Sequence, residues 1–111
     1  MAVIHGIVID CAHPLKLAEF WREALGYEYR MKEDDWCSLR APGRGSPFLS
    51  FATVPEGKVV KNRVHLDIRP ETGTLDEEQE RIERLGATTL EFFDKGQWNH
   101  YIMADPEGNE F

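Results

Sequence analysis

Two histidines stand at matched points of the sequence, His5 near its start and His65 sixty residues later. A neutral imidazole exchanges protons near physiological pH, so either side chain could act as a general base. Imidazole nitrogen is also a common ligand of divalent metals. Asp67 follows His65 by two residues, and in a strand both side chains would share a face, where the carboxylate could orient the ring. His5 and His65 are therefore the candidate catalytic residues.

The first histidine lies in a segment with the pattern of a strand followed by a helix. Residues 3–10 form a β-branched run that predicts the strand, and Pro14 suits the first position of the helix. A stripe of apolar residues follows at helical spacing: Leu17, Phe20, Trp21, Ala24 and Leu25. Gly26 favours the end of this helix. The strands expected next cover residues 27–31, 36–40 and 48–54.

The same order of elements begins again in the second half of the sequence. Residues 63–69 alternate between apolar and polar side chains, which predicts a strand. Thr74 and Glu77 form a capping box at the start of a helix that Gly86 should end. The further strands expected cover residues 88–93 and 98–103, with a last one opening at 109–111.

The two halves match at a constant offset of sixty residues. The pairs that show it are His5 with His65, Leu25 with Leu85, and Gly26 with Gly86. An internal duplication accounts for strand, histidine, helix and glycine recurring in the same order. We therefore predict an α+β fold built of two β-α-β-β-β modules, residues 1–57 and 58–111, within a single domain of residues 1–111.

A sheet of this kind must bury one of its faces beneath its helix. The match with Val64 and Ile68 predicts that Ile4 and Val8 face the helix in the first strand. His5, Ile7 and Ile9 should then lie on the opposite face. Two such sheets placed side by side would curl into a cup, with both histidines near its floor.

Length, charge and cysteine content narrow the class of protein. The chain has 111 residues and a net charge of −7, and an acidic surface makes nucleic acid and anionic membranes poor partners. No apolar run approaches the roughly 20 residues of a membrane span, and no secretory signal is evident at the start. Cys11 and Cys37 are too few for a disulfide scaffold. We expect reduced thiols in a cytoplasmic protein.

Several motifs, taken in order, resemble the vicinal oxygen chelate superfamily, and most closely its small glyoxalase-like domain proteins. That superfamily includes glyoxalases, bleomycin- and fosfomycin-resistance proteins and extradiol dioxygenases. The resemblance covers essentially the whole chain and implies the cupped mixed sheet of the glyoxalase/bleomycin resistance fold. The motifs are His5, Leu17-Ala18-Glu19-Phe20-Trp21, Leu25-Gly26, Val64-His65-Leu66 and Asp105-Pro106-Glu107-Gly108-Asn109-Glu110-Phe111.

The resemblance also implies where a metal would bind. Metal-binding relatives take one ligand from the first and one from the last strand of each half, which places His5 and His65 at two of the positions. The third falls at or beside Ser50, where such relatives have glutamate, glutamine or histidine. The fourth falls beyond Phe111, with Glu110 a weak substitute. One hypothesis is a divalent metal held by His5 and His65; the other is that both imidazoles form hydrogen bonds in the cup and bind no metal.

Aromatic and polar side chains on the predicted strands could line a pocket for a small-molecule ligand, although core packing is the alternative for each aromatic. The candidate ligand-binding residues are Trp36, Ser50, Phe51, Asp67, Phe92, Trp98 and His100. One functional hypothesis is a glyoxalase-like lyase, isomerase or dioxygenase that acts on a small oxygen-rich metabolite. A second is a protein that sequesters a small molecule, as bleomycin-resistance proteins do, and a third is a structural or regulatory homodimer. The resemblance implies a homodimer in each case.

Overall fold

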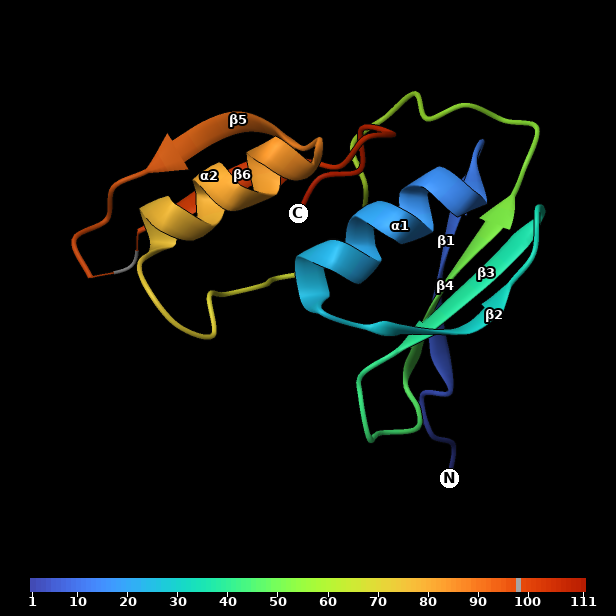
Figure 1. Cartoon of the computed structure of the whole chain (residues 1–111). Helices are drawn as coiled ribbons and strands as arrows, with labels where there is room; N and C mark the ends of the chain where they lie inside the picture. Colours follow the sequence, from blue (N-terminus) through green and yellow to red (C-terminus); the bar gives the residue numbers. More distant parts are fainter. Residues whose placement is uncertain (98) are drawn as a thin grey trace. The chain divides into compact units, whose positions relative to one another are not determined.

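The computed structural model describes residues 1–97 and 99–111, which divide into two compact units (Figure 1). Unit 1 covers Met1–Gly57 and unit 2 covers Lys58–Phe111. The elements of unit 1 are β1 (Gly6–Cys11), α1 (Pro14–Leu25), β2 (Glu28–Lys32), β3 (Trp36–Arg40) and β4 (Phe48–Thr53). Those of unit 2 are α2 (Leu75–Leu85), β5 (Thr88–Phe93) and β6 (His100–Ala104). No helix within the described residues is both long and apolar enough to cross a membrane.

Helix α1 forms as predicted from its apolar stripe. Pro14 occupies its first turn, where the missing backbone N–H leaves no hydrogen bond unmade. Leu17 and Trp21, one turn apart on the stripe, are almost completely buried. Gly26 ends the helix with a φ of 68°, and its N–H donates to the carbonyl of Arg22. Glycine adopts this left-handed conformation without the steric strain that a Cβ would add.

The sheet of unit 1 has the strand order β1-β4-β3-β2, with β1 and β4 parallel and the other neighbours antiparallel. Helix α1 covers one face of this sheet (Figure 1). Tyr29 identifies that face, because its hydroxyl donates to Glu19 of α1 at 2.7 Å. Tyr29 pairs with Leu39, and Leu39 pairs with Leu49, so all three side chains lie on the helix side. We call the opposite face the open face.

The pairing of β1 with β4 shows that the predicted orientation of the first strand is wrong. Ile7 pairs with Leu49 and Ile9 pairs with Phe51, which places both isoleucines on the helix side. Val8 pairs with Ser50 on the open face and is 52% exposed. The prediction fails because a shift of one residue in register exchanges the two faces of a strand, and only the partner strand sets that register.

In unit 2, α2 begins as the capping box predicts. The Thr74 hydroxyl accepts from the backbone N–H of Glu77 at 3.1 Å, and the helix ends at Gly86. Strands β5 and β6 pair antiparallel. The last predicted strand begins to pair with β6, since Met103 and Phe111 exchange two backbone hydrogen bonds of 2.8 Å.

The strand predicted at residues 63–69 is not present, although the structure describes all seven residues. Its counterpart β1 is held by β4, whose position in the second half would begin at Gly108. Residues 109–111 form hydrogen bonds with β6 and none of them pairs with residues 63–69 among the described contacts. An alternating sequence does not stay extended in a sheet without a partner for its backbone groups, so the prediction is wrong for this segment.

Candidate functional site

Two buried hydroxyl groups lie side by side on the open face of unit 1. Ser38 of β3 and Ser50 of β4 pair directly and are 0% and 3% exposed. The Ser50 hydroxyl donates to Oγ of Ser38 at 2.9 Å, and Nε of Arg30 donates to the same oxygen at 3.1 Å. Ser50, which the family resemblance singled out, is thus part of a polar group with Ser38 and Arg30. Sequence reasoning did not single out Arg30.

His5 contacts Phe48, which precedes Ser50 by two residues on β4. The rings of His5 and Phe48 meet edge to face, with their centroids 5.1 Å apart. The His5 carbonyl also accepts from the backbone N–H of Phe48 at 2.9 Å, which extends the pairing of β1 with β4. Phe48 precedes Ser50 by two residues and therefore shares the open face. No motif marks Phe48 as functional, so sequence reasoning missed it.

The two remaining candidates of unit 1 lie on opposite faces of the sheet. Trp36 precedes Ser38 by two residues on β3 and therefore lies on the same open face. Its side chain is half-buried. Phe51 pairs with Cys37 on the helix side and is completely buried. Phe51 therefore packs in the core of unit 1, which is the alternative that the sequence left open for each aromatic residue. Neighbouring residues of one strand point to opposite faces, and the register decides which face is buried.

Three predicted site residues of unit 2 line one cavity of about 650 Å³: His65, Asp67 and His100. Nε2 of His65 lies 3.5 Å from Oδ1 of Asp67, so the expected pairing of these side chains is present. The ring of His100 stacks on that of Phe93 at 4.9 Å. Phe92, 45% exposed, contacts the Tyr101 ring and is not among the described residues that line the cavity. Trp98 lies outside the described residues.

The apolar side chains that line this cavity include Leu66, Ile68, Leu75, Ile82 and Met103. They come from residues 65–70, α2 and β6. The first two match β1 and α1 at the sixty-residue offset, and β6 matches β3 in the order of the elements. In unit 1, β4 lies between β1 and β3. No described strand of unit 2 lies at the corresponding place, and polar side chains line the cavity at Lys61, Arg69, Glu78 and Gln79 as well as at His65, Asp67 and His100.

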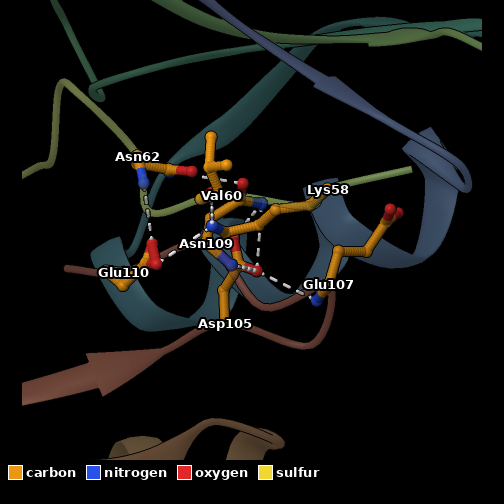
Figure 2. Close-up of polar contacts among 7 residues, drawn as sticks. All are labelled: Lys58, Val60, Asn62, Asp105, Glu107, Asn109 and Glu110. Carbon is orange, nitrogen blue, oxygen red and sulfur yellow. Dashed lines mark hydrogen bonds and ion pairs between the residues drawn. The ribbon is translucent and has the colours of Figure 1, made fainter. Parts of the chain in front are cut away.

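Lys58 and Asn62 bind the carboxylate of Glu110, and Asn62 also contacts Asn109. We call these four residues the polar clasp (Figure 2). Nζ of Lys58 lies 2.9 Å from Oε1 of Glu110, and the backbone N–H of Asn62 donates to Oε2 at 3.1 Å. The side-chain amide of Asn62 donates to Oδ1 of Asn109 at 3.3 Å. The hydrogen bond from Lys58, with that from Asn62, lowers the pKa of Glu110 to about 2.

Within each unit, the described side chains do not form a group of metal ligands. The Ser50 hydroxyl donates to Ser38, and both carboxylate oxygens of Glu110 accept hydrogen bonds within the polar clasp. Among the described residues, no three histidine, cysteine, aspartate or glutamate side chains are grouped closely enough to hold a metal. Stable protein sites for divalent metals use three or four such ligands.

Acidification should release the polar clasp. The pKa of Glu110 is lowered from an ordinary value of 4.5 to about 2, so its ion pair contributes fully to stability above pH 4.5. That contribution is lost as the pH falls through about 2. We expect the Glu110 carboxyl ¹³C resonance to titrate near pH 2, and Lys58→Met to move its midpoint up toward 4.5. A midpoint near 4.5 in the unchanged protein would contradict the binding of the Glu110 carboxylate by Lys58 and Asn62.

Solved structures with similar folds cover almost the whole chain. A glyoxalase/bleomycin resistance protein/dioxygenase family enzyme from Burkholderia phytofirmans is 16% identical, with a TM-score of 0.75 over 99% of this chain and 95% of the other. The E126Q mutant of the fosfomycin resistance protein FosX from Listeria monocytogenes is 14% identical, with a TM-score of 0.76 over 99% and 86%. A glyoxalase-related enzyme from Fulvimarina pelagi is 16% identical, with a TM-score of 0.70 over 99% and 85%.

The fold predicted from the motifs is confirmed by this similarity: an α+β chain with a mixed four-stranded sheet and a second, smaller sheet. No curated protein sequence matches the chain significantly. The family model of the glyoxalase-like domain, in contrast, matches residues 6–111. The chain therefore belongs to the glyoxalase-like domain family, within the glyoxalase/bleomycin resistance/dioxygenase group of folds.

Proposed function

We propose that the chain binds a small oxygen-rich metabolite on the open face of unit 1 and promotes proton transfer on it, as a glyoxalase-like lyase or isomerase. The observation that carries the proposal is the contact of the His5 imidazole with the ring of Phe48, which precedes Ser50 by two residues on the same strand face as the Ser38 and Ser50 hydroxyls. An imidazole beside hydrogen-bonding groups can remove a proton next to a carbonyl and return it to a neighbouring atom. His65, paired with Asp67, offers the same chemistry in unit 2.

The similar folds support the class of ligand. The FosX mutant was crystallised with Mn(II) and 1S,2S-dihydroxypropylphosphonic acid, which is a small oxygen-rich molecule. In this chain, Ser50 and Glu110, which lie at or near positions where metal-binding relatives have ligands, form hydrogen bonds with other side chains. The proposal therefore assigns proton transfer to imidazole groups of the chain itself and involves no metal-dependent step.

Binding without turnover is the second candidate function. The hydrogen bonds of Ser50 and Glu110 favour this function, because they occupy side chains that a metal would use. A protein that only sequesters a ligand needs no metal. The apolar side chains exposed beside the polar group, Val8 and Met31, would add contact area for such a ligand.

Metal analysis and ligand screening of the purified, undigested protein test both functions. We expect well below one bound metal per chain, and NMR-detected binding and turnover of a member of a panel of small 2-hydroxy and 2-oxo acids. His5→Gln should abolish turnover and keep the chain folded. His13→Gln is the matched control, since it makes the same change near the start of α1.

The outcomes separate the two candidates. Binding without turnover in the unchanged protein would favour sequestration. Turnover that survives in His5→Gln would contradict the role given to His5, and turnover that survives in both His5→Gln and His65→Gln would contradict a role for either imidazole. A stoichiometric metal that is lost in the His5→Ala/His65→Ala double variant would overturn the metal-free chemistry proposed for the chain.

A further inference from the structure

Arg30 occupies an irregular position in the sheet of unit 1. In the pairing of β2 with β3, Tyr29 faces Leu39 and Met31 faces Ser38, so Arg30 is an extra residue in a bulge. A bulge changes the direction of a side chain, and bulges are frequent next to functional sites. Here the guanidinium of Arg30 reaches the hydroxyl of Ser38 on the open face.

The guanidinium is held in a fixed position by two contacts. Nε donates to Oγ of Ser38, which is itself fixed by the hydroxyl of Ser50. The guanidinium carbon also lies 4.1 Å from the centroid of the Phe48 ring, where the face of the ring attracts a cation. Because the side chain is already ordered, a ligand that binds it loses less conformational freedom on binding.

The folding of the sheet does not require an arginine at this position. The sheet of unit 2 has the same irregularity between Thr89 and Glu91, sixty residues later, and the residue in that bulge is Leu90. Leucine carries no charge and forms no side-chain hydrogen bond, yet the bulge is present. The charge of Arg30 therefore serves something other than the bulge itself.

Arg30 also differs from Arg22 and Arg40 of the same unit in the partners of its guanidinium. Arg22 is paired with the carboxylate of Glu19, and Arg40 with that of Glu28. Within the described part of the chain, Arg30 forms no ion pair, and only its Nε donates a hydrogen bond. A guanidinium has further N–H donors in a planar fork, which suits the two oxygens of a carboxylate.

We propose that Arg30 is the anchor of a small carboxylic acid with an apolar body, bound on the open face of unit 1. The carboxylate pairs with the terminal nitrogens of Arg30, and the body lies against the exposed side chains of Val8 and Met31. These residues pair with Ser50 and Ser38, so they flank the polar group on both sides. The inference rests on the proposed function for the use of this face, and it adds the class of substrate.

The placement of His5 is consistent with such a ligand. His5 and Arg30 both contact the ring of Phe48. An acid anchored at Arg30 would thus bring its neighbouring carbon atoms close to an imidazole that can exchange protons. Arg30 is a binding residue in this arrangement and takes no part in the proton transfer.

Benzoate is a suitable probe, and benzamide is its uncharged counterpart of the same shape. We expect benzoate to shift the NMR resonances of the Arg30 side-chain Nε–H and of the backbone of Phe48 and Ser50. Arg30→Leu should weaken benzoate binding about tenfold or more, as expected for the loss of a charged bidentate contact. The variant should still fold, because unit 2 has leucine at the matching position.

Two controls make the test specific. Arg40→Leu removes a guanidinium from the same sheet, but one that is paired with Glu28, and it should change benzoate affinity less than about threefold. Arg30→Lys keeps the charge without the planar fork and should give an intermediate affinity. Inorganic phosphate should compete weakly, since it lacks an apolar body.

Three results would overturn the inference: equal affinity in Arg30→Leu and the unchanged protein, equal binding of benzamide and benzoate, or phosphate binding as tightly as benzoate. The failure of the proposed function would be distinguishable. If benzoate binds through Arg30 and the acid panel shows no turnover, the anchor stands and the proton-transfer function fails. If turnover depends on His5 and is unchanged in Arg30→Leu, the proposed function stands and the anchor fails.

Discussion

Replacement of Phe51 by alanine should lower the free energy of unfolding by about 3–5 kcal/mol. The side chain is completely buried on the helix side of β4, between the register partners Ile9 of β1 and Cys37 of β3. Helix α1 closes this layer, so the surrounding side chains have little freedom to fill the space that the ring leaves. Urea unfolding followed by circular dichroism measures the loss.

Phe92→Ala is the matched control for this change. Phe92 also lies in a strand but is 45% exposed, and its main ring contact is with Tyr101. Its replacement should cost about 1 kcal/mol. If Phe51→Ala were as stable as the unchanged protein and lost ligand binding instead, the assignment of Phe51 to the core would be wrong.

Asp105→Ala should destabilise unit 2 by about 2–4 kcal/mol. The Asp105 side chain is buried, and its Oδ1 accepts from the backbone N–H groups of Glu107 and Asn109 at 2.9 and 3.0 Å. The side-chain amide of Asn109 donates to the same carboxylate. Alanine would leave these donors without their charged acceptor and would loosen the turn that presents Glu110 to the polar clasp (Figure 2).

Hydrogen exchange of the amides of Met103 and Phe111 reports on this turn directly, because these residues exchange backbone bonds next to it. Both amides should exchange faster in Asp105→Ala. Asp105→Asn keeps an acceptor oxygen and should have a smaller effect. Glu107→Ala is the control, since Figure 2 shows its carboxylate pointing away from Asp105. Equal protection in Asp105→Ala and Glu107→Ala would refute the role of the carboxylate.

Sequence reasoning found part of the candidate site. Ser50, which the family resemblance singled out, lies on the open face, and the predicted His5 contacts the ring of Phe48. Arg30 and Phe48 were missed, because an arginine in an exposed strand and an aromatic at a strand start are ordinary features. Their role depends on a bulge and on a cross-strand neighbour, and neither leaves a pattern in the local sequence.

Local patterns determined the helices and the fold class. Pro14, Gly26, Thr74 and Glu77 act within a turn or two of the chain, so the amino-acid order by itself predicts where the two helices begin and where the first ends. The order of motifs then indicated the family. Only the tertiary structure decided which face of β1 is buried, that residues 63–69 form no strand, and that Arg30 meets Ser38 and Phe48. The reason is physical: a strand obtains its register, its hydrogen bonds and its buried face from a partner distant in sequence.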